Sequence, residues 1–370
     1  MSLSVRRIHW VSWHPTPYHD YLFESLAKNK YVDLIVHYIS PLLKSHPWKT
    51  AFGRTNQTRT CKLFLKIDWR LLLIGWQDAN AYFLIASWNH PTAQALLTML
   101  RLLKRAYGVW TDTPDSSLKR KPLKAILRQL WLKWIFSGAT HVLGTGKPAI
   151  YVLEQMGAPR ARLLNFPFFV DLSSYKPIQR SIGYCPNRVI RLMSSGRLEN
   201  RLKGHDIAIR ALALVAGRGE KKFEYFIVGS GPDEENLRTL AKELKLETEV
   251  NLFGWVEPEE LRSLYHTADI LIHPSPVHDP FPNAILEAMA AGLVVLGSDV
   301  SGSALDRIEH GANGFVHSAG DYHELSEQIS FLLENIQCIC EIGKRARMTA
   351  ELWPIEYGIS TVERMIRQSV

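Results

Sequence analysis

The chain has 370 residues, more than the roughly 250–300 at which a single hydrophobic core stops growing, so two domains are expected. Hydrophobic residues make up 46% and charged residues 22% of the sequence, a balance that excludes a disordered or fibrous chain. The net charge of +8 is uneven, because residues 1–180 hold 25 Lys and Arg against 9 Asp and Glu, a net +16, whereas residues 181–370 hold 19 against 27, a net −8. This asymmetry predicts an anionic partner for the first half.

The sequence carries no pattern typical of membrane spans or secretion. Its longest run without a polar residue, Ala288–Gly297, has ten residues, and a spanning helix needs about 20. The polar residues behind the first two arginines also argue against a signal peptide. Four scattered cysteines favour neither a disulfide framework nor a zinc site, so we expect a protein of the reducing cytoplasm.

The first half alternates strands with helices. Strands are predicted at Arg7–Trp13, Val32–Tyr38, Tyr82–Ala86, Tyr107–Thr111 and His141–Gly144, and helices at Tyr18–Lys28 and Thr92–Arg105. Residues 40–60 have little periodicity and predict a long surface loop. The apolar segment Leu63–Trp76 fits either the core or a membrane contact.

A second alternating series follows a linker rich in proline and glycine. Strands are predicted at Val189–Ser194, Tyr225–Val228, Val250–Phe253, Ile270–His273, Val294–Leu296 and Phe315–His317, with helices at His205–Val215, Glu234–Leu244, Pro258–His266, Asn283–Ala290 and Glu324–Glu334. We therefore predict an α/β protein with domains at residues 1–175 and 188–350, a linker at 176–187 and a terminal segment at 351–370. Tandem doubly wound domains are expected to bind a ligand in the cleft between them, at the carboxyl ends of their strands.

The most informative segment is His278–Gly292, which follows a predicted strand and opens a helix. Backbone N–H groups near Phe281 and Asn283 would face an anion, helped by the helix dipole. Asp279 lies before the helix and Glu287 more than one turn inside it, so a carboxylate stands on either side of that anion. Two hydroxylated groups joined by phosphates describe a nucleotide-sugar.

Loops after two earlier strands carry cations and glycines. Arg197 and Lys203 frame the turn at Gly196, where they suit a diphosphate. Gly229 and Gly231 allow close backbone approach. Glu234 stands where a dinucleotide-binding fingerprint needs its third glycine, and this weakens the interpretation of the chain as a dinucleotide oxidoreductase.

These motifs, in this order, resemble the E-x7-E class of retaining glycosyltransferases of family 4, which have the GT-B fold of two Rossmann-like domains. The resemblance implies that Asp279 contacts the donor sugar, Glu287 the ribose, and Arg197 with Lys203 the diphosphate. It also implies that Trp255 and Val256 meet the nucleobase and that the helix at Ile355–Gln368 crosses back to the first domain. Asp279 departs from the glutamate that is usual in the family.

The first half resembles the family less. Thr16, Tyr18 and His19 occupy the loop after the first strand, which in the family faces the donor phosphates and the acceptor. Thr111 stands where many members carry a histidine, so Asp112 is the nearest polar candidate, and His90 is a further one.

The resemblance implies transfer of a sugar with retention of configuration, and we expect a UDP or GDP type donor, a lipid-linked or glycan acceptor, and no metal or other cofactor. The sequence has no Asp-x-Asp, and Arg197, Lys203 and helix N–H groups would stabilise the leaving diphosphate. Alternatives are a nucleotide-sugar epimerase, a phosphorylase or a non-catalytic sugar-nucleotide-binding relic. The acidic second half disfavours a nucleic-acid partner.

Residues 119–136 form a basic amphipathic pattern with Leu123, Ile126, Leu127 and Leu130 on one face. Lys121, Lys124 and Arg128 lie on the other. The pattern fits an anionic membrane surface and equally a helix whose apolar stripe packs into the core.

Overall fold

The computed structural model describes residues 5–40, 58–61, 64, 66–115, 118, 120–175, 188–219 and 223–368. The chain divides into two compact units, one comprising Met1–Phe169 with Ile355–Val370 and the other Val170–Pro354. The first domain, predicted to end at 175, ends at Phe169, because Val170, Leu172 and Tyr175 pack in the core of the second unit. The predicted linker, 176–187, lies outside the described residues.

The first unit is built on a parallel sheet with strand order β3-β2-β1-β4-β5-β6-β7. Its strands are β1 (Arg6–Ser12), β2 (Val32–Tyr38), β3 (Thr58–Thr60), β4 (Tyr82–Ala86), β5 (Tyr107–Thr111), β6 (His141–Gly144) and β7 (Leu163–Asn165). Near-continuous burial along β1, β4 and β5 is typical of strands covered on both faces.

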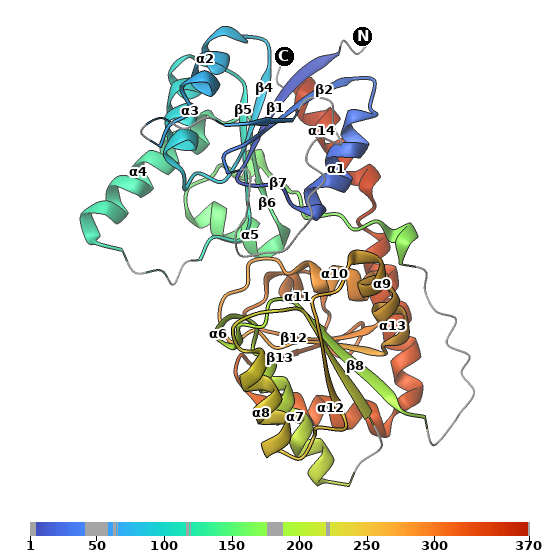
Figure 1. Ribbon diagram of the computed structural model, residues 1–370. Coiled ribbons are helices and arrows are strands. Elements are labelled where there is room, and N and C mark those ends of the chain that lie inside the picture. The colour runs from blue at the N-terminus through green and yellow to red at the C-terminus, as the bar shows by residue number, and fades with distance from the viewer. Residues whose placement is uncertain are drawn as a thin grey trace. The chain divides into compact units, whose positions relative to one another are not determined.

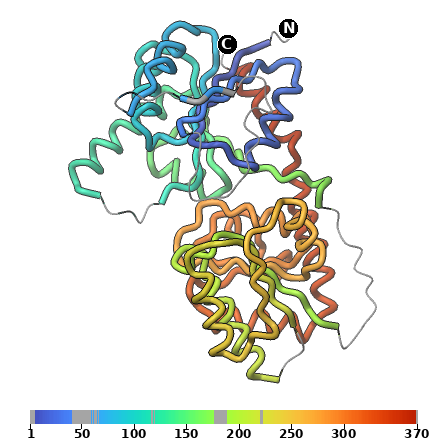
Figure 2. Tube along the Cα trace, in the orientation of Figure 1, coloured from blue at the N-terminus to red at the C-terminus, as the bar shows by residue number. Residues whose placement is uncertain are grey.

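Helices connect these strands and cover the sheet (Figure 1). They are α1 (Pro17–Ala27), α2 (Trp69–Gln77), α3 (Pro91–Leu102), α4 (Pro122–Gly138), α5 (Gly146–Gln155) and the 3₁₀ turn η1 (Arg160–Arg162), with α14 (Ile355–Gln368) from the chain's end. Figure 2 shows α14 alongside α1. Arg6 donates to the Ile366 carbonyl at 2.9 Å and Asn29 to Glu363 at 2.8 Å, so the terminal helix belongs to the first unit.

The second unit has a parallel sheet with strand order β10-β9-β8-β11-β12-β13. Its strands are β8 (Ile190–Ser195), β9 (Phe223–Val228), β10 (Val250–Gly254), β11 (Ile270–His273), β12 (Val294–Ser298) and β13 (Phe315–His317). Its helices are η2 (Leu172–Ser174), α6 (Asn200–Lys203), α7 (His205–Gly217), α8 (Glu234–Glu243), α9 (Pro258–Thr267), α10 (Asn283–Ala290), α11 (Gly302–Arg307), α12 (Tyr322–Glu334) and α13 (Ile336–Glu351). The α/β prediction of two doubly wound, Rossmann-like units is confirmed.

Strand order reverses once in each sheet, and this positions the candidate residues. In the second unit β8 lies between β9 and β11, and in the first unit β1 lies between β2 and β4. Loops leaving the carboxyl ends of such neighbouring strands diverge and leave a binding crevice. The segments that start at Gly196 and Pro274 therefore emerge side by side.

Two local predictions need correction. Residues 58–60 belong to the predicted loop 40–60, yet they form β3, whose Thr58 pairs with Val36 of β2. This edge strand depends on a partner distant in sequence, which local periodicity does not reveal. The first strand ends at Ser12, because the proline-containing segment after it begins to turn into α1.

The amphipathic segment combines both of its predicted environments. Leu132, Ile135 and Phe136 at the end of α4 are buried in the first unit's core. Leu123, Ile126, Leu127 and Leu130 at its beginning are 55–68% exposed. Among the described helices, none is long and apolar enough to cross a bilayer.

Candidate functional site

Asp279 is the centre of a buried polar cluster in the second unit. Its Oδ2 accepts hydrogen bonds from Lys203 Nζ at 2.5 Å, His273 Nε2 at 2.9 Å and Ser275 Oγ at 3.0 Å. Burial alone would raise the pKa of the Asp279 carboxyl, but the hydrogen bond from His273 and the charge of Lys203 hold it well below its ordinary value. Asp279 is therefore ionised and held in one orientation.

A glycine lets Lys203 reach this carboxylate. Gly204 follows α6 with φ +67°, and a Cβ there would lie 2.2 Å from the Pro274 carbonyl oxygen. Only glycine tolerates both the left-handed backbone and this close approach. The α6–α7 turn thus packs against the segment after β11, and Lys203 faces Asp279.

The loops after β8 and β9 touch through their backbones. Gly229 has φ +141°, and a Cβ on it would lie 1.9 Å from the Gly196 carbonyl oxygen. Hydrogen bonds join Gly196 N to Val228 O at 3.0 Å and Leu198 N to Ser230 O at 3.1 Å. A Cβ on Gly231 would likewise meet Leu198 O at 2.3 Å. The glycines serve close packing of two loops at one edge of the sheet.

Arg197 projects from this loop and is 37% exposed on its side chain. Its Nε lies 3.3 Å from Glu199 Oε2, so the two predicted cations have different partners. Both remain partly accessible, since the Lys203 side chain is 24% exposed. Arg197 can leave its partly exposed partner at little cost, whereas Lys203 stays on the buried Asp279 carboxylate and offers an anion its accessible side.

Helix α10 places Glu287 beside two tyrosines. Burial raises the pKa of Glu287 to about 7, while hydrogen bonds from Tyr265 and Tyr175 act in the opposite direction. Tyr265 is itself held by Ser195 Oγ at 2.6 Å. The two acids of the motif consequently differ in protonation near neutral pH, because Asp279 has cationic neighbours and Glu287 has none that dominates.

Unpartnered polar atoms surround the start of α10. Phe281 is buried before the helix, and Pro282 begins it without a side-chain cap. Within the part of the chain that the structure describes, Asn283 Oδ1 and Ser301 Oγ are buried without a hydrogen-bond partner. Ser301 forms a backbone bridge with Asp279. Together with the first N–H groups of a helix, which lack intrahelical acceptors, these atoms are suited to a polyhydroxylated, anionic ligand.

Trp255 and Val256 follow β10 next to the glycine loop. Gly229 N donates to Gly254 O at 2.8 Å, which ties β10's end to that loop. Trp255 is 39% exposed, whereas Val256 packs against the core. The backbone of this segment is therefore placed beside the loops that carry Arg197.

The first-unit candidates all follow strands β1, β4 and β5. Thr16 caps α1 by accepting from His19 N at 3.3 Å, and His90 caps α3 by accepting from Thr92 N at 3.1 Å. Asp112 is exposed and accepts from Thr145 Oγ1 at 3.4 Å. These positions share one edge of the sheet, as expected for parallel strands.

His19 and Tyr18 lie in an aromatic environment. The His19 ring is 5.2 Å from Trp110 and 5.6 Å from Phe168, and Tyr18 lies 6.4 Å from Phe168. Burial lowers the pKa of His19 to about 3, so its imidazole is neutral near pH 7. It suits hydrogen bonding or packing better than binding of phosphate by charge.

Sequence reasoning missed four side chains of the second-unit site: His273, Ser275, Tyr175 and Tyr265. The sequence signal for the first pair was a histidine at the end of a buried strand and a serine two residues later. The tyrosines carry no comparable signal, because Tyr175 and Tyr265 are brought together only by packing, with rings 5.9 Å apart.

The second unit is similar in sequence to known glycosyltransferases. Residues 181–350 match the family model of glycosyl transferases group 1. The putative colanic acid biosynthesis glycosyltransferase WcaL of Escherichia coli K12 is 29% identical over 205 residues, covering 54% of this chain and 49% of WcaL. The amylovoran biosynthesis glycosyltransferase AmsK of Erwinia amylovora is 35% identical over 167 residues, covering 44% and 40%. The matches thus span about half the length of these curated relatives.

Among solved structures, the Anabaena protein HepE in complex with UDP has a TM-score of 0.76 at 18% identity, covering 98% of this chain and 100% of HepE. HepE in complex with UDP-glucose gives 0.71 at 19% identity, covering 98% of both chains. At this identity the likeness shows the fold. The chain therefore has the GT-B fold, and its residues 181–350 are similar to the glycosyl transferases group 1 domain.

Proposed function

We propose that the chain is a retaining glycosyltransferase of the family 4 type, which transfers a sugar from a nucleotide-diphosphate sugar to a hydroxyl of a lipid-linked or polysaccharide acceptor in bacterial-type cell-surface glycan synthesis. The observation that carries the proposal is the convergence of Lys203, His273 and Ser275 on Asp279, next to the glycine loop with Arg197. The names of WcaL and AmsK support a role in polysaccharide synthesis. HepE's complexes with UDP and UDP-glucose favour a UDP-type donor over a GDP-type one.

The donor would lie along the edge formed by β8, β10 and β11. Arg197, Lys203 and the first N–H groups of α10 would hold the diphosphate, with Gly196, Gly229 and Gly231 admitting it close to the backbone. Trp255 and Val256 would meet the base, and Glu287 the ribose. Asn283 and Phe281 complete the wall at the start of α10.

Asp279 would orient the donor sugar through Oδ1, since Oδ2 is already occupied by three donors. Its low pKa keeps it an acceptor of sugar hydroxyl protons. The acceptor hydroxyl attacks on the face from which the diphosphate leaves, and its proton passes to a donor phosphate oxygen. Lys203 and Arg197 stabilise the charge that develops on the leaving group, so the proposed reaction needs no divalent ion or other cofactor.

We propose that the first unit presents the acceptor through Thr16, Tyr18, His19, His90 and Asp112. Residues 119–136 would hold the enzyme on the inner, cytoplasmic face of an anionic membrane, because the exposed leucines at the start of α4 accompany Lys121, Lys124 and Arg128. Binding to anionic vesicles that weakens with added salt is the expected result.

The decisive experiment is a thermal-shift screen with UDP-, GDP- and ADP-glucose. A donor present at 100 times its Kd stabilises the folded state by about 2.7 kcal/mol, which raises Tm by about 5–10 °C for units of this size. Nucleotide release that requires an added acceptor then separates a transferase from an epimerase, and independence of phosphate separates it from a phosphorylase. Absence of any shift, together with no binding by calorimetry, would overturn the proposal.

The stereochemical part has its own test. Proton NMR of the transferred sugar is expected to show the anomeric configuration of the donor, and an inverted product would refute retention. If Arg197 and Lys203 stabilise the leaving diphosphate without a metal ion, the enzyme should keep its full turnover in EDTA. A rate that EDTA abolishes and Mg²⁺ or Mn²⁺ restores would contradict metal independence.

A further inference from the structure

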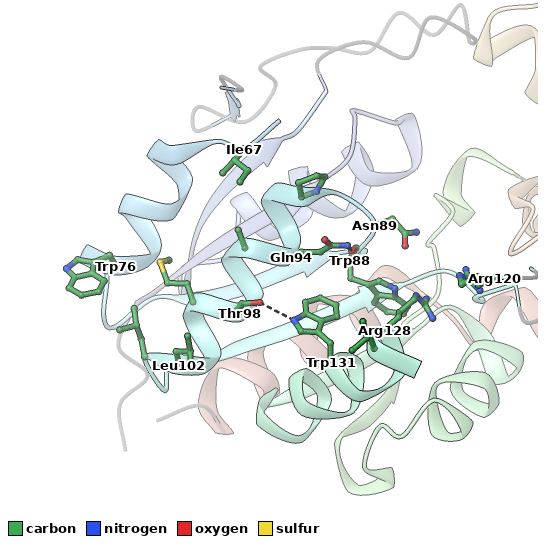
Figure 3. Close-up of a pocket in the computed structure, with 15 residues that line it drawn as sticks. Ile67, Trp76, Trp88, Asn89, Gln94, Thr98, Leu102, Arg120, Arg128 and Trp131 are labelled. Atoms are coloured by element: carbon green, nitrogen blue, oxygen red, sulfur yellow. Dashed lines mark hydrogen bonds between the residues drawn. The ribbon is translucent and has the colours of Figure 1, made fainter. Parts of the chain in front are cut away.

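The first unit has a groove that is lined by none of the residues proposed to bind the donor. It runs between α2, α3 and α4 and has a volume of about 1070 Å³, which is in the range of pockets for sizeable organic ligands. Figure 3 shows that Trp76 and Leu102 lie at one end, while Asn89, Arg120 and Arg128 lie toward the other. The groove is thus apolar at one end and cationic at the other.

The apolar end exposes large side chains to solvent. Trp76 is 60%, Leu102 68% and Leu127 58% exposed, and they come from three different helices. Single exposed apolar residues are common on soluble proteins, but their gathering along one concavity marks a binding surface. The shape and chemistry fit a hydrocarbon chain.

The cationic end lacks an internal counter-charge. Arg128 lies over the Trp88 ring, with 5.7 Å between the guanidinium carbon and the ring centroid. Burial, and then the charge of nearby Arg120, lower the pKa of Arg128. Over the described ranges, no carboxylate forms an ion pair with either arginine. Two like charges held close together favour an anion between or beside them.

An unpartnered donor lies at the same end. Trp88 is 3% exposed, and its Nε1 is buried without a hydrogen-bond partner among the described residues. By contrast, Trp131 Nε1 in the same groove donates to Thr98 Oγ1 at 3.1 Å. A buried indole N–H without an acceptor is costly, which sets Trp88 apart from Trp131.

The three helices that form the groove contain no acidic residue at all. Their sequences include Arg70, Arg101, Lys124, Arg128 and Lys133, but neither Asp nor Glu in α2, α3 or α4. The complement of such a surface is anionic.

We propose that this groove binds a single molecule of a phosphorylated lipid, with the phosphate at Arg120 and Arg128 and the hydrocarbon chain along Leu127 toward Leu102 and Trp76. The proposal concerns binding by the first unit and goes beyond the proposed glycosyl transfer, so the two can fail separately. The bilayer contact proposed for residues 119–136 would use Leu127 and Arg128 as well, and the experiment separates that contact from a single bound lipid.

The probe is dodecyl phosphate, titrated below its micelle-forming concentration into the full chain by calorimetry. We expect one saturable site, an affinity that falls about threefold for each methylene removed from the chain, and no measurable binding of inorganic phosphate. Dodecyltrimethylammonium has the same chain and the opposite charge, so it should bind at least about tenfold more weakly. Equal affinity for both amphiphiles, or uptake of many molecules without saturation, would overturn the proposal.

Matched variants on α4 test the location. Leu127→Asn and Arg128→Gln alter residues that line the groove. Their matched controls, Leu123→Asn and Lys124→Gln, remove a leucine and a positive charge from the same helix outside the groove. Both leucines are mostly exposed, so melting curves should stay unchanged. The groove variants should lose about tenfold in affinity for dodecyl phosphate and the matched variants nothing. Equal losses in both pairs, with parallel losses on phosphatidylglycerol vesicles, would assign the surface to a bilayer instead.

Discussion

The cations of the two candidate sites have different surroundings. In the second unit Lys203 faces Asp279 and Arg197 faces Glu199, whereas Arg120 and Arg128 in the first unit have no carboxylate partner among the described residues, Arg128 lying over Trp88 and Arg120 donating to the Leu118 carbonyl. A paired cation is held in place before its ligand arrives, which suits a site where orientation decides the chemistry. Unpaired cations beside exposed leucines and tryptophans suit attraction of an anionic amphiphile. Under the two proposals, the cations of the second unit orient a donor and those of the first unit attract an anionic lipid.

The largest expected effect concerns the backbone geometry of the second unit. Gly229→Ala would place a Cβ 1.9 Å from the Gly196 carbonyl oxygen at φ +141°, so we expect a loss of about 3 kcal/mol or more in the free energy of unfolding. Gly217→Ala is the control, since a Cβ there meets nothing within 4 Å, and it should be neutral or slightly stabilising. Urea melts of both variants measure the difference, and equal stability would show that the loop contact does not constrain the site.

Lys203→Ala tests the paired cation. Turnover should fall by roughly 10²-fold or more, as on removal of an oxyanion donor, while Lys242→Ala at the end of α8 should leave it unchanged. Initial rates at saturating donor provide the measurement. Wild-type turnover in Lys203→Ala would remove the role assigned to this cluster.

The two acids of the second unit should respond differently to pH. The pKa of Glu287 lies near 7, above its ordinary 4.5, so the folded state binds this proton more tightly than the unfolded chain. Its contribution to stability is complete below about pH 4.5 and is lost as the pH rises through about 7. Because the side chain is partly accessible, we expect roughly 1–2 kcal/mol.

Thermal melts between pH 4.5 and 8 measure this effect, and Glu287→Gln should flatten the decline relative to the parent chain. Asp279, whose pKa is lowered, should contribute in the opposite sense and only under more acidic conditions. A decline of equal slope in Glu287→Gln would place the titrating group elsewhere.

The smallest effect separates capping from acceptor binding in the first unit. His90→Ala removes the side-chain acceptor of Thr92 N and should cost about 0.5–1 kcal/mol of stability. His90→Asn restores the cap. If His90 contacts the acceptor, the asparagine variant regains stability but not turnover. Recovery of both stability and turnover in His90→Asn would show that His90 acts only as a helix cap.

Much of the second unit's site was predictable because its residues sit within short motifs at strand ends. Asp279, Glu287, Arg197 and Lys203 were candidates because they follow predicted strands, and parallel strands bring their carboxyl ends together. The position of His273 at a strand terminus was visible, but its contact with Asp279 was not. That contact depends on the turn between them, which loop sequence does not specify.

The groove of the first unit was less predictable, because the residues that form it lie on helices. The α4 pattern indicated an apolar stripe without indicating where the core ends, so the burial of Ile135 and the exposure of Leu127 could not be separated. Periodicity reports which residues share a face and is silent on what covers that face. The environment of α2, most of which lies in the apolar segment Leu63–Trp76, could not be predicted for the same reason.

The sequence by itself determined the alternation of strands and helices, the opposite charges of the two halves, and the order of the motifs, because these follow from local pattern and composition. Only the tertiary structure decided which carboxylate meets which cation, that Tyr175 and Tyr265 hold Glu287, and that three acid-free helices enclose a groove. Those facts rest on contacts between residues far apart in the chain, and such contacts are set by packing and strand order rather than by any single segment.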